Sequence, residues 1–323
     1  MKGQIRTRYT RLVGVALVAL LIAASAVTVF AQRTQFISIA TGGTAGTYYP
    51  LGGAMGEIFN QNVPGVNASV QATGASVANV NMMAQGQVEL ALIQNDIAFY
   101  AANAVEMFQN PIANLRGIAT LYPEVIQIVA RADAGIRTIE DLRGKRVAVG
   151  DAGSGTEANA RQILAAAGLS YDDITVRYLS FAEASNNLRD GHIEAAFVTA
   201  GIPTAAIQDI ASQRDIVIVP VGPDLLEKLV ADYPFYTGVT IPGGTYRGVN
   251  DDVHTVAVKA MLAVRADLSE DLVYNLTKAL FENLDRMAAA HAAGRLISLE
   301  SAQDGMPIEL HPGAARYFAE VGQ

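Results

Sequence analysis

The sequence predicts an α/β protein of two similar lobes, each a mainly parallel sheet flanked by helices, with a hinge between the lobes. Two repeats predict this fold class. A strand, a glycine-rich loop and a helix follow one another twice, from residue 36 and again from residue 145. Later in each unit, Gly86–Gln94 resembles Gly191–Thr199: glycine, a spacer, an aliphatic residue and glutamate precede a buried strand. The preserved order and spacing favour two related lobes over coincidence.

The elements of each repeat can be placed by their residue patterns. The strand 36–41 runs through Gly42–Thr47 into a helix that reaches about Asn60. The strand 145–149 runs through Gly150–Thr156 into a helix that Gly168 ends. Continuous apolar strands that alternate with helices are typical of parallel sheets covered by helices.

Two extended segments predict how the lobes are joined. The stretch 121–129 precedes the second repeat, and 241–245 with the strand 253–264 follows it. Two crossings divide the chain into lobe one, residues 32–125 and 238–323, and lobe two, residues 126–237. A long amphipathic helix is expected over 269–293, capped by Ser269, with a purely structural role.

Composition excludes several classes of function. The chain has 323 residues, 51% of them hydrophobic and 17% charged, with 31 acidic and 23 basic residues. Four of the basic residues lie within the first 31 positions, so the remainder is strongly acidic and has no electrostatic footprint for nucleic acid. There is no cysteine, and the four histidines are widely spaced, so we expect neither a metal nor a cofactor.

The first 31 residues have the pattern of an export signal. Lys2, Arg6, Arg8 and Arg11 precede an uncharged apolar stretch from Leu12 to Val29, and small residues stand before a cleavage point after Ala31. The stretch is also close to the length of a membrane span, so an uncleaved N-terminal anchor is the alternative. Either way, the rest of the chain is expected outside the cytoplasm, in the periplasm.

The two glycine-rich loops are the strongest indication of a binding site. Free N–H groups and the positive end of the helix dipole make such helix starts suitable for anions. The phosphate-loop pattern is absent because Thr156 stands where lysine is required, and the dinucleotide fingerprint is absent from 42–47. Ser154 is not in a nucleophile-elbow pattern, so a non-enzymatic protein is favoured.

These considerations predict a set of ligand-binding residues on facing loops and strand ends. Arg161 either adds positive charge or is a solvated helix residue. The predicted ligand-binding residues are Thr44, Gly46, Thr47, Tyr48, Ser76, Gln94, Asn95, Ser154, Gly155, Thr156, Thr199 and Gly201.

Several motifs together resemble the TAXI family, the substrate-binding proteins of TRAP transporters. They are Thr41–Gly53, Leu121–Glu124, Gly150–Thr156, Ala195–Phe197, Gly201–Thr204, Ile241–Tyr246 and His311–Ala314. The resemblance implies a type II periplasmic binding-protein fold that closes on a small organic acid: a glutamate-like molecule, a dicarboxylate or a 2-oxo acid. It also implies delivery of that ligand to TRAP permease membrane subunits, by a protein expected to be a monomer.

Two other functions remain open. A periplasmic sensing subunit would use the same site but pass ligand occupancy to a membrane kinase. An exported hydrolase would use Ser154 as a nucleophile, although no histidine is near it in the sequence.

Overall fold

A computed structural model of the chain describes residues 34–323, and residues 36–323 form one compact unit. The predicted export signal or anchor at 1–31 lies outside the described residues. Within the described part, no helix is both long and apolar enough to cross a membrane.

Ten strands form one continuous sheet in which neighbours are ordered β2-β1-β3-β10-β4-β7-β5-β6, with β8 paired to β4 and β9 to β10. The outer pairs β1–β3, β5–β6 and β5–β7 are parallel, whereas β4 and β10 run antiparallel to each other and to the strands on either side. The strands are β1 (Gln35–Ala40), β2 (Val66–Gln71), β3 (Leu90–Gln94), β4 (Leu115–Arg131), β5 (Arg146–Ala148), β6 (Thr175–Arg177), β7 (Ala195–Ala200), β8 (Ile216–Val219), β9 (Thr237–Ile241) and β10 (Val253–Arg265).

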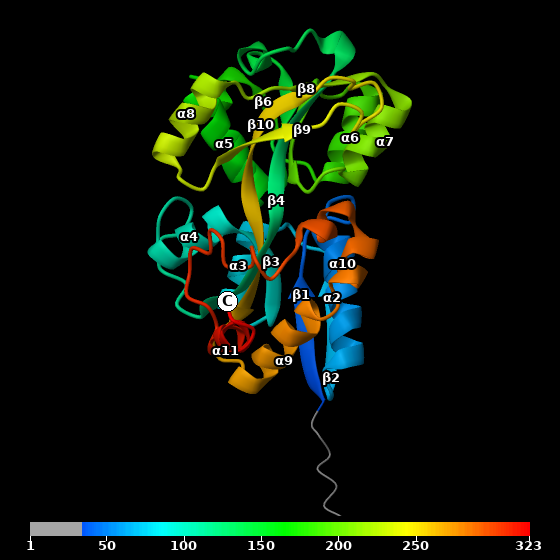
Figure 1. Cartoon of the computed structure of the whole chain (residues 1–323). Coiled ribbons are helices and arrows are strands. Elements are labelled where there is room, and N and C mark those ends of the chain that lie inside the picture. The colour runs from blue at the N-terminus through cyan, green and yellow to red at the C-terminus, as the bar shows by residue number, and fades with distance from the viewer. Residues whose placement is uncertain (1–33) are drawn as a thin grey trace, which may run out of the picture. The chain divides into compact units, whose positions relative to one another are not determined.

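The two long strands β4 and β10 join the halves of the sheet (Figure 1). One end of their pairing, from Leu115 opposite Arg265, lies beside β3. The far half of β4, from Val125, pairs instead with β7 and β8. The register of the β4–β10 pair shifts between Lys259 and Met261, close to Glu124. Glu124 therefore lies where β4 passes from one half of the sheet to the other.

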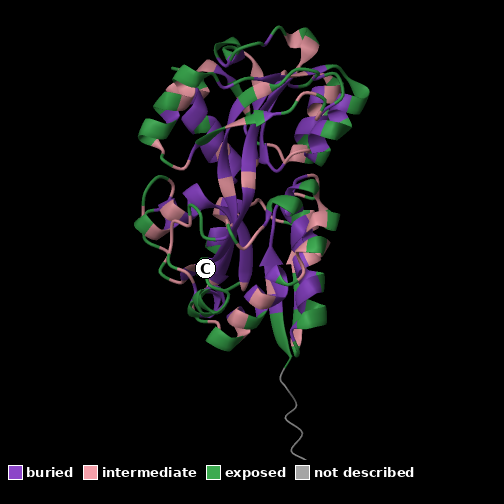
Figure 2. Cartoon of the chain, viewed as in Figure 1, coloured by how far each residue is buried: buried purple, intermediate pink, exposed green. Residues whose placement is uncertain are grey.

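We call the elements around β1–β3 the first lobe and those around β5–β9 the second lobe. Helices lie on both faces of the sheet in each lobe, and the central strands β3, β4, β7 and β10 are almost entirely buried (Figure 2). The first lobe has α2 (Tyr48–Asn62), α3 (Ser76–Ala84), α4 (Asn95–Asn103), α9 (Glu270–Phe281), α10 (Leu284–Ala290) and α11 (Pro312–Glu320). The second has α5 (Gly155–Ala166), α6 (Phe181–Asp190), α7 (Ala205–Gln213) and α8 (Pro223–Asp232). The boundaries expected at 125/126 and 237/238 stay a prediction.

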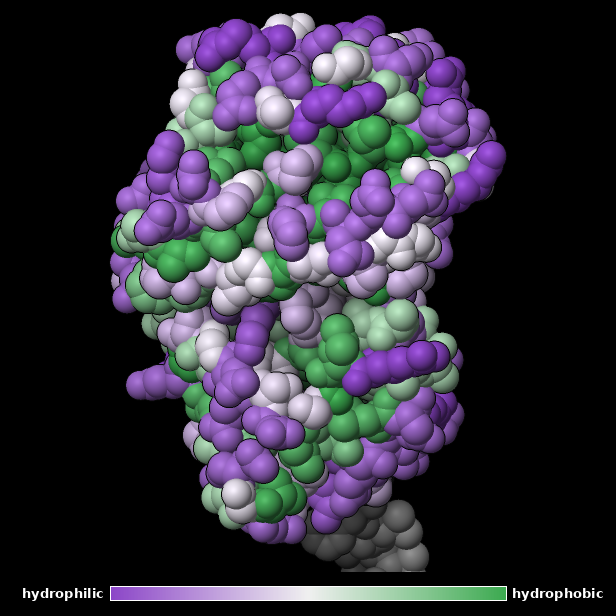
Figure 3. Space-filling view, turned by 45° about the horizontal axis from the view of Figure 1, so that its top comes forward, coloured by the Kyte–Doolittle hydropathy of each residue, from purple (hydrophilic) through white to green (hydrophobic). Residues whose placement is uncertain are grey.

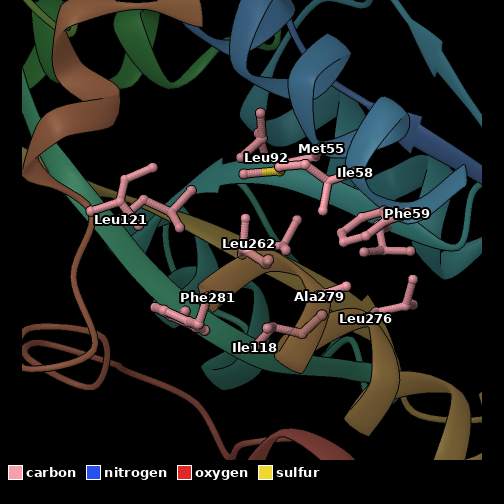
Figure 4. Close-up of a cluster of buried hydrophobic side chains, with 14 of the residues drawn as sticks. Met55, Ile58, Phe59, Leu92, Ile118, Leu121, Leu262, Leu276, Ala279 and Phe281 are labelled. Atoms are coloured by element: carbon pink, nitrogen blue, oxygen red, sulfur yellow. The ribbon is translucent and has the colours of Figure 1, made fainter. Parts of the chain in front are cut away.

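Apolar side chains pack on both faces of the sheet in each lobe. In the first lobe, α2 and α9 cover one face, and Phe59, Leu262 and Phe281 meet between them and the strands (Figure 4). A second cluster, with Ile93 and Ile97, lies under α3 and α4 on the other face. The second lobe has a cluster on each face in the same way. These cores fix the lobes as rigid supports for the loops between them.

The single long helix expected over 269–293 is wrong. Ser269 does cap a helix, accepting a hydrogen bond from the N–H of Leu272, but α9 ends at Phe281 and α10 starts at Leu284. After the break, α9 packs mainly on α11 and also contacts α2, whereas α10 packs on α2. Phe281 and Met287 are both buried in the same core, and this burial outweighs the continuity of one helix.

Candidate functional site

The first glycine-rich loop places the start of α2 against the second lobe. Thr47 stands at the N-cap of α2, but its hydroxyl does not cap the helix. It donates instead to the carbonyl oxygen of Gly201, at the end of β7, over 3.2 Å. Nearby, the N–H of Ala206 donates to the carbonyl of Ala45 over 3.2 Å. This flank of the site is therefore closed by direct contacts between the lobes.

The second glycine-rich loop places the start of α5 in the same way. Ser154 caps α5 by accepting a hydrogen bond from the N–H of Glu157 over 3.1 Å. The first N–H groups of the helix, at Gly155 and Thr156, have no partner within the helix. Gly150 has a φ of +96°, and a side chain there would press on Ser154 and Thr156. The loop conformation therefore depends on glycine.

A pocket of about 40 Å³, partly open to solvent, lies between these two helix starts. The surface between the lobes shows polar and apolar side chains together, whereas the outer end of the second lobe is mainly hydrophilic (Figure 3). The pocket is lined by Gly42, Gly43, Gly46, Thr47, Tyr48, Ala75, Ser76, Gln94, Glu124, Asp151, Ser154, Gly155, Thr156, Phe181, Thr199 and Ala200.

Most residues expected at the site line this pocket, and three lie elsewhere. Thr44 is exposed at the turn of the first loop. Asn95 points toward the C-terminal part of the chain, where it accepts from the N–H of Lys259 and donates to the carbonyl of Gly305. Gly201 packs against Thr47 and contributes to the contact between the lobes. Ligand contact by any of the expected residues stays a prediction.

The sequence prediction missed Glu124, the most unusual group in the pocket. Glu124 is 2% exposed, and its carboxyl accepts a hydrogen bond from the hydroxyl of Tyr48 over 3.0 Å. Burial raises the pKa of Glu124 to about 8, against the opposing effect of the Tyr48 hydrogen bond. A charged residue within the apolar stretch 121–129 was the signal that could have found it.

The sequence prediction also missed two other residues that line the pocket, Asp151 and Phe181. Asp151 follows Gly150 in the second loop, and burial raises its pKa. Phe181 begins α6, which is fixed by a capping box at Ser180. Nothing in the sequence around Phe181 distinguishes it from an ordinary core residue.

Positive side chains are absent from the lining of this pocket in the described part of the chain. Arg161, the expected candidate, forms an ion pair with Glu157 one turn away, over 3.2 Å. It is therefore a helix-surface residue. An anionic group in the pocket would rely on N–H groups and hydroxyls for its hydrogen bonds.

A buried polar network connects the lobes behind the pocket, and its centre is Asn159 of α5, which is 0% exposed. Its amide nitrogen donates to the carboxyl of Asp96 and to the hydroxyl of Tyr236, each over 3.0 Å. Its oxygen accepts from the side chains of Gln94 and Thr199, each over 3.1 Å. Since Gln94 and Thr199 also line the pocket, the network ties the ligand site to the packing of one lobe on the other.

Asp96 is the ionisable group of this network. It is fully buried at the start of α4, and burial raises its pKa to about 7, although the N–H of Ile97 and the amide of Asn159 both donate to it. In this arrangement Asp96 therefore keeps its proton up to near neutral pH.

The chemistry of the site favours binding over catalysis. The hydroxyl oxygen of Ser154 serves as a helix cap, and no histidine is among the residues that line the pocket in the described chain. Residues 34–323 contain no cluster of three or more histidine, aspartate or glutamate side chains that could hold a metal ion.

Comparisons with known proteins agree with this geometry. A family model described as the NMT1-like family matches residues 39–322. The alkanesulfonate-binding protein SsuA from Xanthomonas axonopodis pv. citri, solved with MOPS bound, has a similar fold, with a TM-score of 0.53 and 16% identity over 89% of this chain and 84% of that one. A protein of Bordetella bronchiseptica RB50 also has a similar fold, with a TM-score of 0.56 and 18% sequence identity. The match covers 90% of this chain and 81% of that one. The predicted two-lobed α/β fold is confirmed.

The resemblance to the TAXI family is wrong, because the family model that matches the chain is the NMT1-like one. The expected TRAP permease partner followed from that resemblance alone and is withdrawn with it. The motifs that suggested it are glycine-rich loops at helix starts and polar residues at strand ends. A two-lobed α/β fold needs such features wherever a ligand is held between its lobes, so they do not distinguish one transporter class from another.

Proposed function

The chain belongs to the NMT1-like family, and from that membership and the pocket we propose that it is a solute-binding receptor for a small organic acid. The ligand is held between the two lobes and is passed to the membrane components of a transporter. The alkanesulfonate-binding protein with a similar fold supports this kind of role. No catalytic step is part of the proposal.

The observation that carries the proposal is the convergence of two helix starts on one pocket. Gly46 to Tyr48 bring the start of α2 from the first lobe, and Ser154 to Thr156 bring the start of α5 from the second. Each start offers N–H donors and the positive end of a helix dipole. An acid group that bridges them would be bound only when the lobes are together.

Closure of the lobes is the second part of the proposed mechanism. The contacts Thr47–Gly201 and Asn159–Asp96 each join a residue of one lobe to a residue of the other. Rotation about the β4 and β10 crossing would break both and open the pocket, as in other two-lobed binding proteins. Ligand binding then shifts the equilibrium toward the arrangement in the structure.

The site of action that we propose is the periplasm. The pattern at residues 1–31 supports export, with the mature receptor free or held by an uncleaved anchor. The acidic net charge of the remainder of the chain supports a protein that stays soluble and monomeric there.

Calorimetry and small-angle scattering together test the proposal. The purified protein is titrated with a panel of small carboxylates and sulfonates, and its radius of gyration is measured at saturation. We expect one class of acid to bind at one site per chain and to reduce the radius from that of the free protein. Failure of every acid to bind would contradict the receptor function, and binding with an unchanged radius would contradict the hinge.

A further inference from the structure

We propose that the ligand carries an ammonium group as well as an acid group, and that Glu124 is the residue that selects it. This inference rests on the proposed receptor function and adds the chemical class of the solute. It comes from two kinds of group that line the same pocket. The helix starts supply N–H donors, and Gln94 at the end of β3 and Glu124 in β4 supply acceptors beside them.

One of these acceptors, the side-chain oxygen of Gln94, lacks a hydrogen-bond donor among the described residues. This oxygen is buried and lines the pocket. The amide nitrogen of the same side chain is already used, because it donates to Asn159 over 3.1 Å. A buried acceptor without a donor is unfavourable, so a donor supplied by the ligand would stabilise the closed form.

Glu124 adds a second acceptor beside it. The hydroxyl of Tyr48 donates to the Glu124 carboxyl, and the side chain of Gln94 lies close enough to lower its pKa as well. A carboxylate can accept several hydrogen bonds, so capacity remains for a ligand group. A ligand ammonium has three donors and suits both Gln94 and Glu124.

The charges around Glu124 also favour a ligand ammonium group. The ionisable groups that face it are Tyr48 on α2, Tyr122 on β4 and Asp96 on α4, and none of them can carry a positive charge. The pocket contains a second carboxyl, Asp151, and no lysine, arginine or histidine among the described residues. A ligand with two carboxylates would bring further negative charge to a pocket that already has two carboxyl groups, Glu124 and Asp151. A ligand ammonium supplies the positive charge that the protein lacks there.

The proposal predicts a proton exchange whose sign distinguishes the two kinds of ligand. Burial keeps much of Glu124 protonated near neutral pH. An ammonium group beside it favours the ionised form, so binding releases a proton from Glu124 to the solvent. A ligand carboxylate at the same place would favour the protonated form, and binding would take a proton up.

Matched ligand pairs test the selectivity. The probes are L-glutamate and 2-oxoglutarate, L-leucine and 4-methyl-2-oxopentanoate, and L-alanine and pyruvate, titrated by calorimetry at pH 7. We expect the amino acid of at least one pair to bind about tenfold or more tightly than its 2-oxo partner, the effect of a hydrogen bond to a charged group. Glu124→Gln should remove most of that preference. Glu57→Gln, the same change at an exposed carboxyl of α2 that pairs with Arg286, should leave it unchanged.

The outcomes separate failure of this inference from failure of the receptor function. Equal or tighter binding of the 2-oxo acids would overturn the ammonium proposal and leave the receptor intact. Binding of another acid of the carboxylate and sulfonate panel, but of no member of any pair, would likewise overturn the ammonium proposal alone. Binding of no acid at all would overturn both.

A measurement on the unmodified protein makes the test independent of variants. Calorimetry of the tightest-binding amino acid at pH 8, in two buffers with different ionisation enthalpies, gives the number of protons exchanged. Release of a fraction of a proton, lost in Glu124→Gln, supports the proposal. Uptake, or no exchange, would overturn it even if the variant did not fold.

Discussion

Replacing Gly155 by alanine should destabilise the closed form of the pocket. Gly155 is the first residue of α5, and a Cβ atom there would overlap the side-chain oxygen of Gln94, which belongs to the other lobe. The lobes would have to separate, or the Gln94 side chain would have to leave its place. In either case the hydrogen bond from Gln94 to Asn159 is lost.

The expected loss of stability of the closed form follows from the Gln94–Asn159 hydrogen bond and from the burial of both side chains. One hydrogen bond contributes about 0.5–1.5 kcal/mol, and a buried polar group left without a partner costs about 1–3 kcal/mol. The closed form should lose about 2–4 kcal/mol relative to the open form, which lowers ligand affinity about 30-fold to 1000-fold. The unliganded protein should keep its melting temperature, because the cores of the two lobes are untouched.

Gly53→Ala is the matched control for this experiment. Gly53 lies in α2, away from the pocket, and no atom is within 4 Å of the place where its Cβ would stand. Calorimetry should give an unchanged affinity for Gly53→Ala and a much weaker one for Gly155→Ala. Small-angle scattering should show that only Gly155→Ala stays extended with ligand present. Equal affinities for the two variants would refute the argument that the lobes must meet at Gly155.

Three further predictions concern the pocket and the network behind it. Thr156→Val should weaken ligand binding by about 1–3 kcal/mol, the effect of a lost bond to a charged group, with little change in melting temperature; unchanged affinity with lost stability would assign Thr156 to the fold. Asn159→Asp would place a second carboxyl beside Asp96, so calorimetry should show affinity reduced at least about tenfold at pH 8 and largely restored at pH 5. Because the folded protein holds protons on Asp96 and Glu124 that the unfolded chain releases, the melting temperature of the free protein should fall as pH rises from about 5 to 8. Asp96→Asn should reduce that slope in scanning calorimetry, and a slope as steep as that of the wild type would contradict the burial argument.

The glycine-rich loops could be predicted because their signal is local. Glycine at positions such as Gly150 and a hydroxyl residue before a helix, as at Ser154, describe a turn and a cap within a few residues. Their repetition in both halves of the chain indicated two lobes before any contact was known. Thr156 and Thr47 line the pocket for the same reason.

The positions of the acceptors Gln94 and Glu124 in the pocket depend on contacts between distant segments of the chain. Glu124 comes to the pocket only because β4 crosses between the lobes beside β10, and Tyr48 reaches it from 76 positions earlier. Asn159 meets Gln94 across 65 positions and Tyr236 across 77. Asn159 has no motif around it. An asparagine on a helix is most often a surface residue, so sequence pattern alone could not distinguish Asn159 from its neighbours.

The break between α9 and α10 shows the same limit at the level of secondary structure. The apolar spacing from Ser269 onward fits one long helix, and the first part of it, with Leu276 and Leu280 buried, is as expected. The helix ends between a half that packs mainly on α11 and a half that packs on α2. Tertiary packing, which periodicity does not describe, decides that boundary.

Mass spectrometry of the small molecules released when the purified protein is denatured tests the central claim most directly. The wild-type protein and Gly155→Ala are prepared side by side, and the released molecules are compared in amount per chain. The account predicts one small organic acid that accompanies the wild type and is depleted in Gly155→Ala, and that binds again when added to the emptied wild-type protein. A released molecule without an acid group, or an acid retained equally by both proteins, would contradict a receptor that holds an acid between the starts of α2 and α5.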